Sequence, residues 1–214
     1  MANNGHQYIP RLALPVLIPL LLAALLAKYY YGWIPAIIIF GIFLILCFLF
    51  RDPKREVPSS PLAVVSPASG YITGISKETD QWMDRTAIKY RIKMSLWDVH
   101  SLRSPAEGKV MNEWASTDKK SGFRRQYTYW IQTDEGDDVV LSILMGLSAL
   151  IVRLTPRCGE RVGQGQPFGF LFFAGMIDVY LPENTKIRIE SGMQVKSGTD
   201  VLGQLVHGKD TPVT

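Results

Sequence analysis

The sequence has few cysteines and histidines and no large excess of charge of either sign. Its two cysteines, Cys47 and Cys158, cannot form a disulfide framework and belong to no C-x-x-C pair. The three histidines lie far apart and lack partners at ligand spacing, so we expect no metal site. They are His6, His100 and His207. The formal net charge of +4 is small, which argues against a nucleic-acid-binding protein, because such a protein carries a large clustered basic surface.

The first 50 residues lack acidic side chains altogether. They contain two basic residues, Arg11 and Lys28, so the other 164 residues hold 21 basic and 19 acidic side chains, a net charge of +2. The apolar runs 12–27 and 34–50 each approach the roughly 17–25 residues that span a bilayer. Tyrosines and a tryptophan lie between them, as is typical of a membrane–water interface. A cleavable signal peptide has only one short apolar run, so the second run argues against it.

We therefore expect residues 1–50 to form a membrane-anchoring helical hairpin. Pro15 and Pro19 interrupt the first run, and a re-entrant or interfacial arrangement is the alternative. Basic residues precede the first run and follow the second, where they are expected to be topological anchors: Arg51, Lys54 and Arg55. The positive-inside tendency places both ends in the cytoplasm. The expected location is the cell inner membrane, with the second domain facing the cytoplasm.

Residues 51–214 have the pattern of one all-β domain. Residues 88–96 alternate apolar and polar side chains, which is the period of a half-buried strand. The segments 127–131 and 139–143 flank the turn sequence Asp-Glu-Gly-Asp, which predicts a hairpin. No long stretch of this part has the amphipathic period of a helix.

Two pairs of short segments in this part resemble each other. SPASGYI at 66–72 resembles SPAEGKV at 104–110, and the segments beginning at Gly159 and Gly192 both read G-x-x-V-x-x-G. Glycines at such fixed spacing mark tight turns between short strands. The second pattern is typical of small sandwich-like hybrid domains such as biotinyl and lipoyl carriers. A carrier needs a lysine at a hairpin tip in a Met-Lys or Asp-Lys context, which Lys196 does not have, so the repeat predicts the fold and no swinging cofactor.

Four separated motifs resemble the short form of the phosphatidylserine decarboxylase family. They are FRDPKREVP at 50–58, VVSPASG at 64–70, MSLWDVHSLRSPAEG at 94–108 and FGFLFFAGMIDVYLP at 168–182. The resemblance runs from the hairpin to about Leu205. It implies a decarboxylase-type β domain on a membrane hairpin and a role in phospholipid metabolism, where the family makes phosphatidylethanolamine.

The resemblance also implies a pyruvoyl group that the family makes from its own chain. A serine in a Gly-Ser bond attacks the preceding carbonyl, and elimination leaves the pyruvoyl group that binds the substrate amine. An Asp in the motif S-P-A-D-G and a His in D-x-H assist the cut. On this chain the histidine corresponds to His100 and the glycine to Gly175, whereas the Asp position is Ser69 and the serine position is Met176.

Two of the three chemical parts are therefore absent from the family positions. The thioether of Met176 has no proton to lose and cannot form a pyruvoyl group, so we expect no cofactor. The hydroxyl of Ser69 cannot replace a carboxylate as a base or as an orienting group. A relocated cut is not expected, because the chain has no Gly-Ser or Gly-Cys dipeptide and only one glycine followed by an aliphatic hydroxyl residue, Gly198-Thr199.

The loop after the D-x-H motif departs from the family pattern but stays basic. Its basic residues are either candidates for contact with anionic lipid headgroups, each worth about 1 kcal/mol near a charged surface, or part of a solvated loop: Lys119, Lys120, Arg124 and Arg125. His100 is either a remnant of the catalytic base or an ordinary buried histidine. Met176 is expected to pack as an apolar strand residue.

Three functions remain open at this point. The favoured one is a non-catalytic family member linked to phospholipid metabolism, with the phospholipid membrane as its partner and an active paralogue or a second copy of the chain as further candidates. The second is an active phosphatidylserine decarboxylase with unconventional processing. The third is a membrane scaffold with no lipid chemistry.

We predict that the domain after the hairpin lies in the cytoplasm, because basic residues flank both outer ends of the hairpin. Two reporters fused in turn after Thr214, one active only in the cytoplasm and one active only outside it, would measure this. Activity of the external reporter alone would contradict the prediction.

Overall fold

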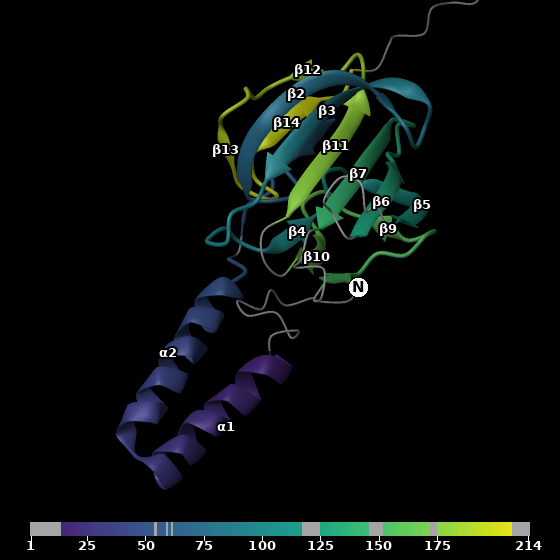
Figure 1. Ribbon diagram of the computed structural model, residues 1–214. Helices are drawn as coiled ribbons and strands as arrows, with labels where there is room; N and C mark the ends of the chain where they lie inside the picture. The colour runs from purple at the N-terminus through teal and green to yellow at the C-terminus, as the bar shows by residue number, and fades with distance from the viewer. Residues whose placement is uncertain are drawn as a thin grey trace, which may run out of the picture. The chain divides into compact units, whose positions relative to one another are not determined.

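The computed structural model describes residues 14–53, 55–58, 60, 62–116, 125–145, 152–171 and 175–206. Contacts divide the chain into two compact units, Met1–Lys54 and Arg55–Thr214. The first unit contains two helices and the second contains the strands (Figure 1).

The first unit contains α1 (Leu14–Tyr31) and α2 (Trp33–Leu49). Gly32 separates them with a φ of 88°, a conformation that glycine adopts without strain. α1 is long and apolar enough to cross a membrane, and α2 is an apolar helix of 17 residues. The few buried side chains are mostly small, as is common where apolar helices pack closely, whereas the large apolar ones point outward. This outward apolar surface supports association with a membrane.

The second unit is built of short and long strands. Their bounds are β1 (Ala63–Val65), β2 (Gly70–Asp80), β3 (Arg85–Lys93), β4 (Ser101–Arg103), β5 (Gly108–Ser116), β6 (Arg125–Gln132), β7 (Asp138–Met145), β8 (Val152–Leu154), β9 (Arg161–Val162), β10 (Pro167–Leu171), β11 (Met176–Pro182), β12 (Lys186–Ile187), β13 (Gln194–Val195) and β14 (Val201–Gln204). The mainly β fold is thus confirmed. The expected hairpin is β6–β7, with Gln132 paired to Asp138 across the turn.

The strands form one large sheet and two small ones. The large sheet is curled and has the order β13-β2-β3-β11-β7-β6-β5-β9 (Figure 1). The small sheets have the orders β1-β14-β12 and β4-β10-β8. The pairings are antiparallel throughout the described strands.

The core lies on one face of the large sheet. Alternate residues of β3, β11 and β7 are buried there and pack with apolar residues of the small sheets, such as Leu102, Phe168 and Leu202. Tyr90 of β3 belongs to this core, and burial raises the pKa of its phenol to about 12. The intervening residues of β3, which include Lys89 and Arg91, face the opposite side of the sheet because strand side chains alternate.

The repeated segments bind one another in matching pairs. The N–H of Gly198 donates to the carbonyl of Ser66 at 2.7 Å, and the N–H of Gly165 donates to the carbonyl of Ser104 at 2.9 Å. Each G-x-x-V-x-x-G segment therefore closes on one SPA segment, 192–198 on 66–72 and 159–165 on 104–110. Their first and last glycines all have positive φ, between 67° and 91°. The expected tight turns are confirmed.

Gly70 and Gly108 are required at equivalent places in the two repeats. A Cβ on Gly70 would lie 2.3 Å from the carbonyl oxygen of Lys93, and one on Gly108 would lie 2.1 Å from that of Gln132. Both of these oxygens are backbone atoms, which cannot move away by a change of rotamer as a side chain can. The start of β2 can therefore approach the end of β3, and the start of β5 the end of β6, only because glycine has no side chain.

We predict that Gly70→Ala destabilises the protein by about 1–3 kcal/mol, the usual cost of overpacking. The matched control is Gly74→Ala in the same strand, where a Cβ meets nothing within 4 Å. That change should be neutral or stabilise the protein by at most about 1 kcal/mol, because alanine loses less conformational entropy than glycine on folding. Thermal unfolding of the two full-length variants in detergent measures the difference. Equal melting temperatures would show that β2 can move away from β3 at no cost.

Candidate functional site

Ser69 lies directly before β2, and two donors bind its side chain. Its side chain is 5% exposed. Its Oγ accepts a hydrogen bond from Nη1 of Arg55 at 2.9 Å and one from the N–H of Ser197 at 3.1 Å. Arg55 also donates to the carbonyl of Ser197 at 2.9 Å. The sequence pattern suggested only a topological anchor at Arg55, but its guanidinium contacts the β domain at a family motif position.

His100 lies directly before β4 and is buried, with 3% of its surface exposed. Its carbonyl accepts the N–H of Leu171 at 3.0 Å, and its ring centroid lies 6.1 Å from that of Phe170. The hydroxyl of Ser197 lies 3.3 Å from the carbonyl oxygen of Ser101, the next residue. The same Ser197 contacts Ser69, so one residue joins the two motif segments.

Asp98 of the D-x-H motif stabilises the turn before His100 by hydrogen bonds to Ser95. Its carboxylate accepts the N–H of Ser95 at 2.8 Å, and its own N–H donates to the carbonyl of Ser95 at 3.2 Å. These two bonds fix the backbone that leads into β4.

Gly175 and Met176 lie where β11 begins. The carbonyl of Gly175 accepts the N–H of Met94 at 3.0 Å. A Cβ on Gly175 would lie 2.5 Å from Cδ2 of Leu171. Met176 is half-buried and is paired with Lys93 of β3 on one side and Leu144 of β7 on the other. It is an apolar strand residue, as expected from the sequence.

The three motif positions converge on one end of the large sheet. Ser69 and Gly175 are joined through Met94, which touches Gly70 and binds the carbonyl of Gly175. His100 and Gly175 are joined through Leu171. Residues separated by more than 100 positions in the chain therefore meet where β3 ends and β11 begins.

Of the basic residues that we proposed as lipid contacts, only Arg125 can be placed. It is exposed, opens β6 and is paired with Met145 of β7. Lys119, Lys120 and Arg124 lie outside the described residues. Within the described part of the chain, no group of three His, Cys, Asp or Glu side chains could hold a metal ion.

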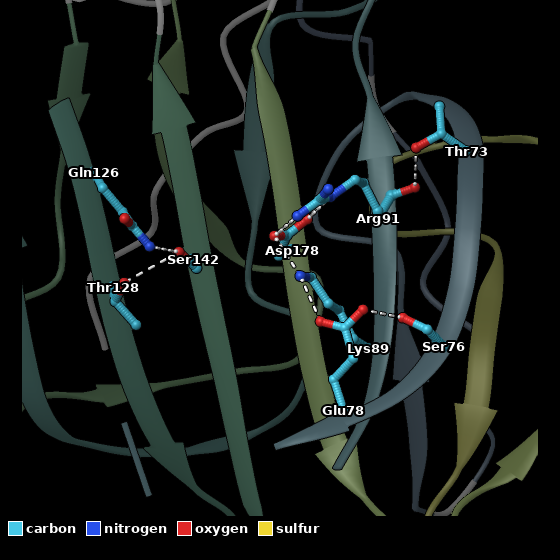
Figure 2. A network of polar contacts seen from close by, with 9 residues as sticks. All are labelled: Thr73, Ser76, Glu78, Lys89, Arg91, Gln126, Thr128, Ser142 and Asp178. Carbon is cyan, nitrogen blue, oxygen red and sulfur yellow. Dashed lines mark hydrogen bonds and ion pairs between the residues drawn. The ribbon is translucent and has the colours of Figure 1, made fainter. Parts of the chain in front are cut away.

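An ion pair with a buried carboxylate lies two residues beyond Met176 and was not predicted from the sequence. Asp178 is buried, and both of its oxygens accept hydrogen bonds from Arg91, each at 2.8 Å (Figure 2). Nζ of Lys89 lies 3.5 Å from Oδ2 of Asp178 and 3.0 Å from Oε2 of Glu78. The hydrogen bond with Asp178 raises the pKa of the Arg91 guanidinium above its ordinary value. One available sequence signal was an acidic residue in the otherwise apolar segment 176–181.

The comparisons with known proteins point to one family. A family model described as phosphatidylserine decarboxylase matches residues 43–203. The chain belongs to the phosphatidylserine decarboxylase family. A phosphatidylserine decarboxylase proenzyme of Nitrosomonas europaea is 35% identical over 207 residues, which cover 93% of this chain and 96% of the relative. The proenzyme of Aromatoleum aromaticum is 31% identical over 214 residues, with 96% and 100% covered. No solved structure matches.

The residues of this decarboxylase-family chain do not fit the pyruvoyl group that the resemblance implies. That group is made from a residue whose hydroxyl attacks the preceding carbonyl, and a thiol is the nearest substitute. Residues 159–184 contain no serine, threonine or cysteine. Ala174, Gly175 and Met176 all lack a nucleophile, so the same conclusion holds whichever neighbour of Gly175 is aligned with the family serine. No step through a pyruvoyl group can be derived for this chain.

We predict that Met176→Ser alone does not restore self-cleavage, because Ser69 still supplies no carboxylate to orient or activate the new hydroxyl. Loss of such an orienting carboxylate costs about 10⁴-fold in related hydroxyl chemistry. The double variant Ser69→Asp/Met176→Ser should be cleaved in part, since Arg55 and the N–H of Ser197 remain as donors for a carboxylate at position 69. Gel mobility and intact mass measure cleavage.

A parallel pair of variants, Gly175→Ser with and without Ser69→Asp, covers the neighbouring register. A Cβ at position 175 meets the mobile end of Leu171 and approaches the carbonyl oxygen of Leu144 at 3.3 Å. Efficient cleavage of either single serine variant would show that the acidic position is not needed.

Proposed function

We propose that this chain is a non-catalytic member of the phosphatidylserine decarboxylase family that acts at the phospholipid membrane. The observation that carries the proposal is the absence of any serine, threonine or cysteine between Cys158 and Thr185. This segment contains Gly175 and the whole of β11, where the family makes its cut. A chain without a serine, threonine or cysteine there lacks the side chain from which a pyruvoyl group could be made.

The surroundings of Ser69 support the same proposal. Its Oγ accepts hydrogen bonds from a guanidinium and from a backbone N–H. A hydroxyl beside a positive charge becomes a weaker base, not a stronger one. Ser69 is therefore suited to holding Arg55 and Ser197 together and unsuited to accepting a proton from another group.

Retention of the fold supports a role in binding rather than in chemistry. The strands, the paired repeats and the convergence of Ser69, His100 and Gly175 are all present, although two of the three chemical groups are not. The apolar helices supply a membrane partner, because their outward side chains would otherwise face water. We propose that the chain lies in the inner membrane with its β domain in the cytoplasm, where it binds phospholipid without decarboxylating it.

We predict that the purified protein remains one chain with the Gly175–Met176 bond intact. Peptide bonds of this family break because a neighbouring hydroxyl becomes the acyl acceptor, and unactivated amide hydrolysis is negligible on the lifetime of a preparation. Intact mass spectrometry of the detergent-extracted chain, with and without hydroxylamine, should give one mass that the reagent leaves unchanged. Phosphatidylserine added to it should lose no CO₂.

The proenzyme of Nitrosomonas europaea, prepared in the same way, is the matched control and should yield fragments and a carbonyl adduct. A fragment of this chain that spans residues 176–214 and begins with a pyruvoyl group would refute the non-catalytic proposal. It would establish instead an active decarboxylase with unconventional processing.

A further inference from the structure

The turn between β3 and β4 exposes two large apolar side chains beside the candidate site (Figure 1 shows the connection). Leu96 is 49% exposed and Trp97 is 68% exposed, whereas Met94 and Val99 on either side of them are buried. The two bonds between Ser95 and Asp98 close the turn. The chain is thus held in a conformation that points two apolar residues outward.

Further exposed apolar residues lie at the same end of the large sheet. Tyr71 is paired with Lys93, the last residue of β3, and the N–H of Ile72 donates to the carbonyl of Met193 at 2.9 Å. Tyr71 and Met193 are each about half exposed, and Lys93 is exposed as well. We call the four apolar residues the apolar rim: Tyr71, Leu96, Trp97 and Met193. A tryptophan, a tyrosine and a lysine beside aliphatic groups have the composition of a membrane–water interface.

Chain connectivity limits how far Arg55, which is bound at this end of the domain, can lie from Leu49 at the end of α2. The side chain of Arg55 is bound to Ser69 and Ser197, and Ser197 lies against Ser101, the first residue of β4. Residues 50–54 alone separate Arg55 from Leu49, where α2 ends. Six extended peptide steps of about 3.3–3.6 Å span at most roughly 20 Å, whatever the orientation of the two units. A membrane that holds the end of α2 is therefore within roughly 20 Å of Arg55, whose side chain binds Ser197 beside the first residue of β4.

We propose that Leu96 and Trp97 insert into the interfacial region of the phospholipid bilayer that holds the hairpin. This inference rests on the membrane attachment in the proposed function. Burial of the indole and the leucine side chain in the interface removes their apolar surface from water. Lys93 then lies at headgroup level. The end of the sheet that carries Ser69, His100 and Gly175 is held against the lipid surface, where a phospholipid headgroup can reach it without leaving the bilayer.

The test uses the full-length chain with a single fluorescent label. Cys47→Ala and Cys158→Ser remove the native thiols, and Leu96→Cys then carries an environment-sensitive fluorophore while Trp97 stays in place. The protein is reconstituted into vesicles of phosphatidylethanolamine and phosphatidylglycerol that contain lipids with a nitroxide near the headgroup. The matched control is Ile187→Cys in the same background, because Ile187 is an aliphatic residue of β12 with 50% exposure.

Insertion of the turn predicts a blue-shifted emission and several-fold stronger lipid quenching at position 96 than at position 187. Adding Trp97→Ser to the labelled chain should lower the quenching at position 96, while the hairpin keeps the protein on the vesicles. Equal quenching at the two positions in protein that floats with the vesicles would overturn this inference and leave the proposed membrane attachment intact.

Two other results would also refute the inference. Protection of the label in detergent that rises with protein concentration would assign the turn to a contact with a second copy of the chain. Failure of the unlabelled chain to float with the vesicles would remove the membrane attachment itself, and with it the reason for an inserted turn.

Discussion

The contact of the Gly70 backbone with the carbonyl of Lys93 is the constraint on which the candidate site depends. At Gly70 the two backbones approach so closely that a Cβ would lie 2.3 Å from the carbonyl oxygen. The next residue of that chain, Met94, donates its N–H to Gly175. A side chain at position 70 would push β2 away from β3 and separate Ser69 from the start of β11. One missing side chain thus keeps two distant motifs together.

The same constraint occurs twice, but the site forms only once. Gly108 lies against Gln132 as Gly70 lies against Lys93, and the hydroxyls of Ser104 and Ser66 each bind a carbonyl two residues ahead. The order of the large sheet reflects this repetition, with β13-β2-β3-β11 on one side and β9-β5-β6-β7 on the other. Near Gly108 the neighbouring strand end leads into the β6–β7 turn instead of into a family motif. The repeat therefore supplies a frame, and the loops attached to one copy supply the site.

Local patterns in the sequence predicted β3, the β6–β7 hairpin and the glycine turns, but not their long-range partners. The alternation at 88–96 predicted β3, which in fact ends at Lys93, because Met94 bonds to Gly175 and the chain then turns at Asp98. Glycine spacing predicted the tight turns, since glycine alone adopts those φ angles freely. Nothing local indicated that Arg55 would bind Ser197, a residue 142 positions away. The resemblance to the family named Ser69, His100 and Gly175, and only the folded chain shows that they meet.

The residues that hold β11 in the sheet differ from those at the family motif positions. Asp178 holds β11 to β3 through two hydrogen bonds to Arg91, and it shares a face of the sheet with Met176 because the two residues are two positions apart. Removing one partner of a fully buried ion pair costs about 3–5 kcal/mol, and the cost is lower here because the Arg91 side chain is 40% exposed. A change at half-buried position 176 breaks no such pair. Mutation can therefore remove a nucleophile from β11 at little cost to folding, whereas loss of Asp178 would weaken the strand that carries the site.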